Sequence, residues 1–523
     1  MPRPTQFFRS RALPVTSAIF ADRMPYLWTA ALILGVSAVL WSLAGRIADG
    51  DFRSVVFGGI VTTAALVGLS VLKNWRTGTY LFITWMLFED LVRKYMGNNM
   101  AIYFAKDVLL AITYISLWRS GAERVNTTLR TSFVFALGLF FLLGLVQVFN
   151  ANSPSLFYGI LGLKLYFYYV PLLFVGYALI RTEGDLHRFL LVNMGLAAVI
   201  ALVGIVQSIV GLDFLNPHGG ADIEELSHLV RQTPSGVAVS RPCSVFVSDG
   251  RFASYLLLAF IVGMGTVGYL LLHRQRGRKL AFPALALVGV AAVMTGSRGM
   301  FTYVTASLIL LSAGFLWGAP RRSGGRSHLF KAIRRSFAMI ALAAGIMIAV
   351  FPQQIAARWT FYRETVFPDS PDSELFDRAW DYPVANFLSA WSDPEWAVGH
   401  GIGTAALGLQ YVTHILGVPA PNIGVENGYG SLILEFGILG LGLWLAWTLS
   451  LIVAACKVLV KLRGTRTFPV ALSISWFAFL LLFPFTWGSM VMYQNFVLNT
   501  YLWLLVGILF RLPQLEMKLA EDI

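Results

Sequence analysis

Long apolar runs alternate with short polar segments along most of this chain. A helix needs about 20 mainly apolar residues to cross the hydrocarbon of a bilayer, and about fourteen runs approach that length. Two polar stretches are much longer than the other connections. The pattern therefore predicts an all-α polytopic membrane protein. The expected spans are 26–45, 54–72, 78–92, 101–118, 131–149, 160–180, 188–211, 252–272, 280–296, 299–317, 337–351, 429–455, 467–485 and 491–510.

The same pattern divides the chain into five parts. N-terminal transmembrane helices occupy 1–211, and the first long loop occupies 212–250. Further transmembrane helices and a basic connecting loop fill 251–351. The second long loop, expected to be partly helical, covers 352–428, and the last transmembrane helices cover 429–523. Because long ordered loops usually carry function, the functional residues are expected on or beside these two loops.

Composition agrees with this assignment. Of the 523 residues, 57% are hydrophobic and only 13% are charged, whereas soluble domains are about one quarter charged. The net charge of +13 does not indicate a nucleic-acid partner, because the basic residues are confined to short loops between apolar runs. Cys243 and Cys456 fall on opposite sides of the predicted membrane, so no disulfide is expected within the chain.

The distribution of lysine and arginine predicts the orientation. Most of the basic residues lie in alternate connections, which places both termini inside the cell and both long loops outside. The first apolar run is long and lacks a small-residue cleavage site, so it is expected to be an anchor. An enzyme on the outer face has no nucleotide pool and needs an activated substrate delivered by the membrane. No internal repeat is evident, so the repeat signal of many secondary transporters is missing.

Four arginines stand out on the predicted outer side. Arg241 ends the first long loop, Arg251 begins the next helix, Arg298 lies in a tight turn between two apolar helices, and Arg378 lies in the second long loop. Planar guanidinium groups bind phosphate or diphosphate in a bidentate way. One arginine alone is explained as a helix cap or a contact to lipid headgroups. Four together favour a phosphate site.

Two residues near the end of the second long loop are candidate bases. Glu426, which Asn427 follows, lies at the junction between loop and helix. An acid there is favourable at a helix N-terminus, and it equally suits a general base acting on an acceptor hydroxyl. His400 is the other candidate, although an ordinary surface or core histidine also explains it. No spacing of histidines resembles a metal site, so neither a metal nor another cofactor is expected.

Ionisable residues also occur inside expected spans, where each needs a partner. Glu435 lies within the helix that follows Glu426, and its simplest explanation is structural pairing with an arginine. Lys106 and Asp107 lie in the fourth expected span. They are expected to form an ion cluster with residues of the third, namely Glu89, Asp90 or Arg93.

The stretch 399–447 joins a Gly-rich loop to a membrane helix, and we interpret it as an active-site lid with its hinge. Its first glycines allow unusual backbone dihedrals or a close approach of the backbone to a ligand. Aromatic residues in the preceding loop suit stacking on sugar rings, and tryptophan is also an ordinary membrane anchor. The residues concerned are Gly399, Gly401, Gly403, Trp380, Trp391 and Trp396.

Four segments within residues 200–450, taken in order, resemble the O-antigen ligase and polymerase superfamily (the Wzy/WaaL type) of bacterial cell-surface polysaccharide assembly. SRPCSVFVSDGRFASYLLL is similar to the family's Arg-containing loop before a helix, and TGSRGMFTYVTASLILL to its Ser-Arg-Gly helix start. FDRAW followed by VGHGIGTA is similar to the Arg-x-x-Trp and Gly-x-Gly element of the large periplasmic loop. VENGYGSLILEFGILGLGL is similar to the segment that closes that loop.

The resemblance implies a GT-C-like fold in the bacterial inner membrane with its active site facing the periplasm. The implied activity is that of a polysaccharide polymerase. It transfers glycan with inversion from an undecaprenyl-diphosphate-linked donor to a hydroxyl of a lipid-linked repeat unit, without nucleotide sugar or metal. Arg241, Arg298, Arg378 and Arg251 would bind the diphosphate. Family ligases place His-Ser or His-Asn where this chain has Glu426-Asn427, so Glu426 or His400 would act as the base, with Asn427 and Glu435 in support.

Two alternatives stay open. A ligase would transfer a finished glycan to lipid A-core or to protein, and a membrane transporter would move an anion or a lipid-linked sugar without chemistry. Polar residues gather near the predicted outer half, which favours the enzyme, because a transporter needs a polar path across the whole bilayer. The implied partners are the lipid-linked oligosaccharide, membrane lipid, a flippase and a chain-length regulator, with no nucleic acid.

Overall fold

The structure is a computed structural model. It describes residues 52–96, 100–121, 132–216, 229–232, 235–273, 277–318, 334–335, 338, 341–342, 345–346, 348–366, 376–406, 409, 413, 417, 424–489 and 492–521. Eight helical segments in this part are long and apolar enough to cross a membrane, so the chain is a multi-pass membrane protein. They are Ala101–Arg119, Leu156–Leu179, Glu183–Val210, Asp249–Leu272, Arg298–Gly318, Gly428–Leu462, Phe468–Gly488 and Phe496–Leu519.

The chain divides into two compact units at Lys73. The described part of the first is the apolar helix α2 (Phe52–Lys73). The second unit contains, in order, α3 (Trp75–Tyr95), α4 (Met100–Arg119), α5 (Ser132–Gln147), α6 (Leu156–Phe167), α7 (Leu172–Leu179), α8 (Glu183–Val210), β1 (Val230–Gln232), β2 (Ala238–Ser240), α10 (Asp249–His273), α11 (Arg278–Met294), α12 (Arg298–Gly318), α14 (Pro352–Val366), η2 (Asp377–Asp381), α16 (Tyr382–Trp391), α18 (Gly428–Leu462), α19 (Phe468–Leu482), α20 (Pro484–Gly488), η3 (Met492–Gln494) and α21 (Phe496–Glu521).

Several expected spans differ in detail from these helices. The expected helix 160–180 is divided into α6 and α7, and Pro171 stands at the start of α7. The expected spans 78–92, 131–149 and 280–296 coincide with α3, α5 and α11, which are not among the eight. The span 26–45 lies outside the described residues, and 337–351 is described only in part. The total of fourteen therefore stays a prediction.

Close helix packing forms the centre of the second unit. Helix α21 is almost entirely buried along its span, and α7 lies along it. A Cβ atom added at Gly507 would lie 2.1 Å from the carbonyl oxygen of Leu173, and one at Gly176 would lie 2.0 Å from that of Leu504. Small residues at such contacts let two membrane helices approach closely, which strengthens their van der Waals packing.

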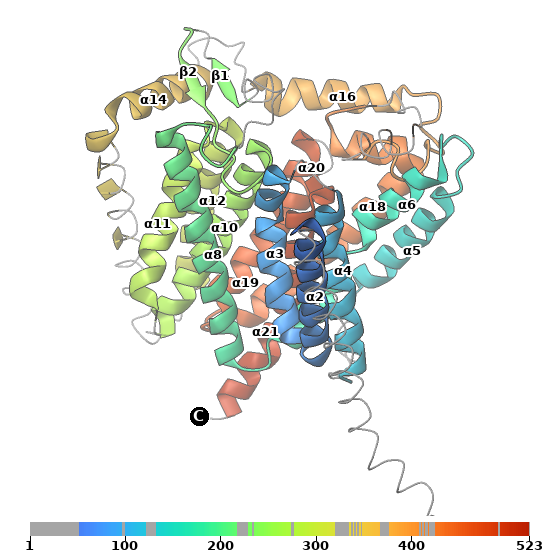
Figure 1. Cartoon of the computed structure of the whole chain (residues 1–523), viewed down its shortest axis with the longest axis horizontal. Coiled ribbons are helices and arrows are strands. Elements are labelled where there is room, and N and C mark those ends of the chain that lie inside the picture. Colours follow the sequence, from blue (N-terminus) through green and yellow to red (C-terminus); the bar gives the residue numbers. More distant parts are fainter. Residues whose placement is uncertain are drawn as a thin grey trace, which may run out of the picture. The chain divides into compact units, whose positions relative to one another are not determined.

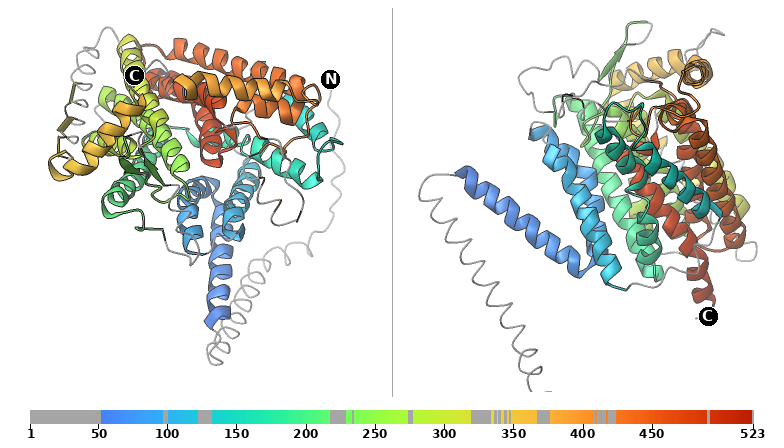
Figure 2. Two further views of the ribbon diagram at one scale, coloured as in Figure 1. Left: turned by 90° about the horizontal axis from the view of Figure 1, so that it is seen from above. Right: turned by 90° about the vertical axis from the view of Figure 1, so that its right-hand side faces the viewer.

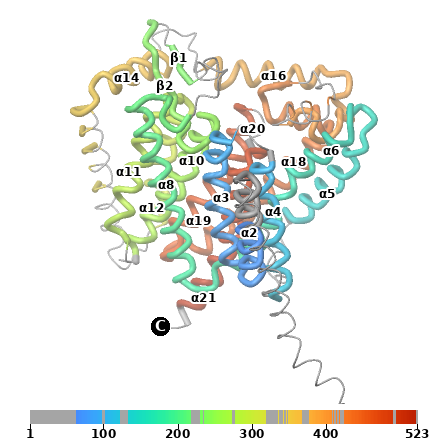
Figure 3. The backbone as a smooth tube through the Cα atoms, viewed as in Figure 1, coloured from blue at the N-terminus to red at the C-terminus, as the bar shows by residue number. Residues whose placement is uncertain are grey.

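The described parts of the two long loops lie at one end of the bundle. Figure 1 shows α14, the hairpin β1–β2 and α16 at the end opposite the C-terminus, and the backbone trace in Figure 3 shows the same arrangement. In the right-hand view of Figure 2, α14 and α16 lie across the ends of the long helices. The hairpin is antiparallel, with Arg231 opposite Val239. We call this the hairpin end of the second unit.

Candidate functional site

Four arginines from separate elements form a cationic cluster at the hairpin end. Partial burial lowers the pKa of Arg231 on β1, and the positive charges of the other three lower that pKa further, whereas the carboxylate of Asp249 raises it. Each of these three guanidinium groups therefore lies near enough to Arg231 for its charge to act there. The arginine cluster consists of Arg231, Arg241, Arg298 and Arg378.

Arg241 is held firmly within this cluster. Its backbone N–H donates to the carbonyl oxygen of Leu229 at 2.7 Å, and its Nη2 lies 2.6 Å from Oδ2 of Asp249. Its side chain is only 15% exposed. Among the described residues, its buried Nε has no hydrogen-bond partner. Asp249 thus fixes the guanidinium of Arg241 through Nη2, whereas Nε can still donate a hydrogen bond to a ligand.

The turn before α12 brings Arg298 close to Arg241. Gly296 in this turn has φ +61°, and a Cβ added there would lie 3.6 Å from Cγ of Arg241 and 3.1 Å from Cγ1 of Val239. Only glycine tolerates this conformation and this contact together. The end of β2 therefore packs directly against the turn that leads into Arg298. Arg241 and Arg298 both act on Arg231, and their convergence on one ligand stays a prediction.

Arg358 on α14 links these elements by hydrogen bonds, and it was not among the site residues predicted from the sequence. The side chain is 3% exposed, and its burial lowers its pKa. Its Nε donates to the carbonyl oxygen of Met294 at 3.2 Å and its Nη2 to that of Ser240 at 3.3 Å. It therefore links α14, the end of α11 and the end of β2. The spacing i, i+3, i+4, i+7 of Arg358, Phe361, Tyr362 and Thr365, all buried, is the signal that would have found it.

Arg251 has a different partner from the one expected. Its Nη1 lies 2.8 and 3.1 Å from the two carboxylate oxygens of Asp90, and Arg93 binds the same carboxylate at 2.9 Å. Asp90 is 1% exposed, and its Oδ2 also accepts the N–H of Val247. Arg251 is thus part of an ion-pair network on α3 and α10, and its assignment as a diphosphate ligand stays a prediction.

The loop between Arg241 and α10 is fixed by its neighbours on both sides. Nζ of Lys94 donates to the carbonyl oxygen of Ser244 at 2.9 Å and contacts Sγ of Cys243 at 3.3 Å. Oε1 of Gln207 accepts the N–H groups of both loop residues, at 2.9 and 2.7 Å. Cys243 and Cys456 are both free thiols.

The expected ion cluster of α3 and α4 is present. Nζ of Lys106 lies 2.7 Å from Oε1 of Glu89, and both side chains are fully buried. Asp107 pairs instead with Lys164 of α6, 2.6 Å away. Each charge in this group therefore has an opposite charge beside it, which is what its burial requires.

Glu426 lies at the edge of the arginine cluster. Its carboxylate is 3.9 Å from Nη1 of Arg378, and both side chains are more than half exposed. Its N–H donates to Oδ1 of Asn386 at 2.9 Å, which fixes the backbone. Asn427 is fully buried. It caps α18 through Gly430 and donates to the carbonyl oxygens of Pro383 and Trp487, so it supports this junction.

Glu435 contacts backbone, not an arginine, which corrects the expected ion pair. The side chain is fully buried, and its Oε1 accepts the N–H of Ala405 at 3.1 Å. Tyr166, Gln494 and the N–H of Gly403 also adjoin its carboxyl group. Glu435 therefore secures the Gly-rich turn in the membrane region and, in the part of the chain described, makes no contact with the arginine cluster.

The Gly-rich turn fills a break in α18. Gly437 interrupts that helix with φ 72° and ψ −173°. The N–H of His400 donates to the freed carbonyl oxygen of Leu434 at 2.7 Å, and Gln147 donates to the carbonyl oxygen of Val398 at 2.7 Å. Residues 401–406 are buried. Such packing is that of a fixed structural element, which corrects the interpretation of this turn as part of a lid.

The turn depends on glycine at three positions. Gly399, Gly401 and Gly403 have φ values of 82°, 102° and 90°. A Cβ at Gly403 would lie 2.0 Å from the carbonyl oxygen of Tyr158, so no other residue fits between the turn and α6. The expectation of unusual dihedrals at these glycines is confirmed.

Replacing Gly403 by alanine is expected to destabilise the protein. The left-handed conformation alone costs about 1–3 kcal/mol for alanine, and the contact with Tyr158 adds to it. Gly464→Ala is the matched control, because Gly464 has φ +85° with no atom within 4 Å of an added Cβ. Thermal unfolding of the purified variants measures the difference. Equal unfolding temperatures for both variants would contradict this packing of the turn against α6.

His400 lies away from the arginine cluster. Its Nε2 is 2.8 Å from Oδ1 of Asp393, and its side chain is 18% exposed. In the described part of the chain, no contact joins His400 to Glu426 or to the arginine cluster. Of the two candidate bases, only Glu426 therefore lies beside the candidate anion site.

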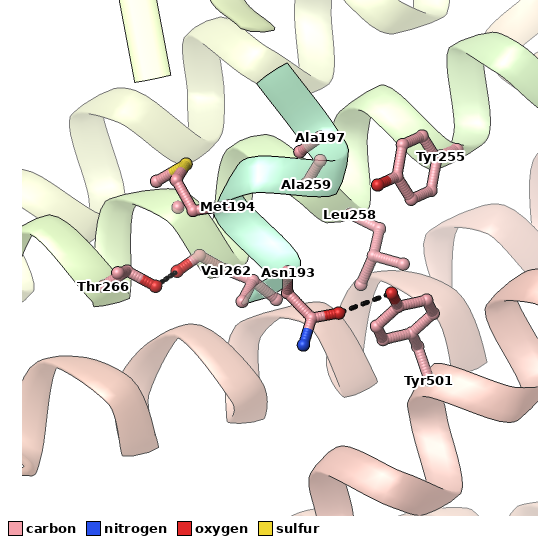
Figure 4. A pocket seen from close by; sticks show the side chains of 10 residues that line it. Asn193, Met194, Ala197, Tyr255, Leu258, Ala259, Val262, Thr266 and Tyr501 are labelled. Atoms are coloured by element: carbon pink, nitrogen blue, oxygen red, sulfur yellow. Dashed lines mark hydrogen bonds between the residues drawn. The ribbon is translucent and has the colours of Figure 1, made fainter. Parts of the chain in front are cut away.

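A small cavity in the bundle is a separate feature. It has a volume of about 20 Å³ and lies between α8, α10 and α21 (Figure 4). Tyr501 donates to Oδ1 of Asn193 at 2.6 Å along its wall. It has room for about one water molecule. The cavity is therefore too small for a substrate.

The arrangement thus gathers cationic side chains around Arg231 and places a carboxylate, Glu426, beside Arg378. Within the described residues, no group of three or more His, Cys, Asp or Glu side chains is placed to hold a metal ion. In comparisons with known proteins, neither a protein-family model nor a curated protein matches this chain. Its function is therefore inferred from its own residues.

Proposed function

We propose that this chain is a polysaccharide polymerase of the bacterial inner membrane. It would transfer glycan from an undecaprenyl-diphosphate-linked donor to a hydroxyl of a lipid-linked repeat unit. In this proposal the hairpin end faces the periplasm, both termini lie inside, and about fourteen helices span the membrane. The resemblance of four segments to O-antigen polymerases and ligases supports this choice among membrane enzymes.

The arginine cluster is the observation that carries the proposal. Its four guanidinium groups outnumber the two carboxylates that contact them, Asp249 and Glu426, so positive charge is in excess among these side chains. A diphosphate that links a lipid to a sugar carries two negative charges. The excess would bind this group and would stabilise the further charge that develops when the bond between sugar and phosphate breaks.

The acceptor hydroxyl needs a base, and Glu426 is placed for that role. In the proposed reaction its carboxylate takes the hydroxyl proton while the acceptor oxygen attacks the anomeric carbon from the side opposite the diphosphate. The bond from the sugar to the diphosphate then breaks, and the lipid diphosphate leaves as an anion held by the arginine cluster. No nucleotide sugar takes part, because the donor is already activated.

Reconstitution in vesicles tests this function directly. The purified protein is given undecaprenyl-diphosphate-linked oligosaccharide extracted from the host and no nucleotide sugar. We expect release of undecaprenyl diphosphate together with glycans that grow by whole repeat units. A ligase would release the lipid diphosphate only when lipid A-core or protein is added as acceptor. If the donor bond stays intact under all these conditions, the proposed function is wrong.

A transporter is the alternative that one observation favours. Three groups of ion pairs lie among the helices of the second unit, involving Asp90, Glu89 and Asp107, and intramembrane charges often mark ion pathways. Such a protein would move lipid-linked oligosaccharide across the vesicle membrane without cleaving it. The same vesicles measure this movement when a sugar-oxidising reagent is added outside.

Glu426→Gln is expected to slow transfer without weakening donor binding. Loss of a general base costs about a hundredfold or more in rate. The variant should fold normally, because the pair with Arg378 is exposed. Single-turnover rates and donor affinity in detergent measure the two effects. Glu516→Gln is the control, since Glu516 lies near the C-terminal end of α21 and accepts the N–H of Thr467 at 2.9 Å, away from the hairpin end. If the single-turnover rate of Glu426→Gln equals that of the wild-type protein, Glu426 is not the general base.

A further inference from the structure

A row of aromatic side chains runs along α16 from the neighbourhood of the arginine cluster. Adjacent ring centroids are 6.0 Å apart for Trp380 and Trp487, 6.0 Å for Trp487 and Phe387, 6.1 Å for Phe387 and Trp391, and 5.1 Å for Trp391 and Trp396. We call these five side chains the aromatic row. They come from η2, α16, α20 and the loop after α16, so folding assembles them from separate segments.

The aromatic row is open to its surroundings. Trp380 is 57% exposed and Trp391 is 42% exposed, and the other three rings are partly exposed. Phe387 and Trp396 pack in part against the hydrophobic core of the unit, so the row is most open at Trp380 and Trp391. Large aromatic rings exposed in a continuous group usually mark a binding surface.

The near end of the row lies beside the proposed reaction site. The π-helical turn η2 carries both Arg378 and Trp380, and such turns often occur at functional sites. The guanidinium of Arg378 lies 4.8 Å from the ring centre of Tyr382 and 3.9 Å from Glu426. A molecule whose diphosphate occupies the arginine cluster could therefore extend its next groups onto Trp380.

The far end of the row carries polar groups as well. Trp396 lies in the segment that contains Asp393, which pairs with His400, and Glu395, which accepts a hydrogen bond from Asn152 at 2.9 Å. The side chains of Asp393 and His400 are about one-fifth exposed. Aromatic faces beside carboxylates and amides are suited to a ligand that has both C–H faces and hydroxyl groups. Pyranose rings have both.

We propose that the aromatic row binds the oligosaccharide of the lipid-linked substrate, with its sugar rings stacked on the tryptophan faces. The inference rests on the proposed function, because the row is continuous with the site proposed for the diphosphate. It adds a site for the glycan and assigns its direction, from Arg378 along α16 towards Trp396. The row would hold a substrate of several sugars in register while its first sugar reacts.

The test uses the full-length protein in nanodiscs and a soluble probe. The probe is the oligosaccharide released by mild acid from the host's lipid-linked pool, so it contains no diphosphate. Calorimetry should detect binding to the wild-type protein. Trp380→Ala and Trp391→Ala should each weaken binding about five- to tenfold, as expected for loss of one stacked ring. Trp391→Phe should retain most of the affinity.

Three control measurements make this test specific to the aromatic row. Trp359→Ala is the matched control, because Trp359 is 67% exposed on α14, outside the row, and its loss should leave binding unchanged. Arg241→Ala should bind the probe normally, so glycan binding is measured independently of the proposed transfer. If the wild-type protein cleaves the lipid-linked donor but binds no free oligosaccharide, the aromatic row is not a glycan-binding site. The proposed function would be unaffected by that result.

Fluorescence quenching by lipid distinguishes glycan binding by the aromatic row from a role in anchoring the protein in the membrane. If the rings insert into lipid, brominated phosphatidylcholine should quench less fluorescence in Trp391→Phe than in the wild-type protein, while probe binding stays unchanged in both alanine variants. That result would overturn the proposal. Weakened probe binding without a change in quenching supports it.

Discussion

Arg241→Ala and Arg298→Ala are each expected to abolish long-chain polymer while the protein still inserts and accumulates. Each change removes one guanidinium from the arginine cluster, and loss of one such electrostatic group costs about 10²- to 10³-fold in rate. Because polymer grows by repeated transfers, a loss of this size leaves only short products. Gel separation of the glycans from a strain that carries the variant in place of the native chain measures the result.

One control variant keeps the positive charge at position 241, and the other removes an arginine outside the arginine cluster. Arg241→Lys keeps the charge but loses the planar fork, so an intermediate polymer length is expected. Arg463→Ala removes an arginine that stacks on Trp317 at the opposite end of the bundle, and it should leave the polymer normal. Immunoblots of the membrane fraction check accumulation. Normal polymer in both Arg241→Ala and Arg298→Ala would count against the proposed site.

Asp90→Asn is expected to destabilise the protein strongly. Its carboxylate is 1% exposed and binds Arg93 and Arg251. Removing one partner of a buried ion pair leaves an uncompensated charge and costs about 3–5 kcal/mol. The loop with Cys243 would lose one of its supports at Val247, so binding of pyrophosphate should also weaken. Thermal unfolding of the purified protein measures the main effect.

Two further variants make this prediction specific. Arg76→Gln breaks a partly exposed pair with Asp185 and should cost no more than about 1 kcal/mol. Combining Asp90→Asn with Arg251→Gln removes a charge of each sign, so the loss should be smaller than the sum of the single losses. Wild-type unfolding temperature in Asp90→Asn would show that the network is not needed for stability.

Hydropathy predicted the spans well because the bilayer imposes a helix length that does not depend on neighbouring helices. The expected spans 188–211, 252–272 and 299–317 agree with α8, α10 and α12 within a few residues. Hydropathy did not reveal the break at Gly437 or the division between α6 and α7. Both are interruptions of a few residues, whose backbone groups are satisfied by contacts that only the tertiary structure supplies.

Three arginines of the candidate site could be singled out from their positions in the sequence alone. Arg241, Arg298 and Arg378 were expected to converge because the positive-inside rule leaves few arginines on the outer side. Arg251 and His400 could not be assigned in this way, because their roles depend on Asp90 and Asp393, carboxylates that folding brings to them. Arg231 and Arg358 were missed for the same reason: the charges and carbonyl oxygens beside them come from other segments of the chain.

The break at Gly437 also constrains how the protein is made. Residues 398–405 leave the ribosome before α18, and they are exported to the far side in the proposed orientation. They then have to return to the depth of the break before α18 moves sideways into lipid, because each bare peptide group in hydrocarbon costs several kcal/mol. In the proposed orientation, integration of this helix would depend on a segment that has already crossed the bilayer, and a delay in export of that segment would delay the helix as well.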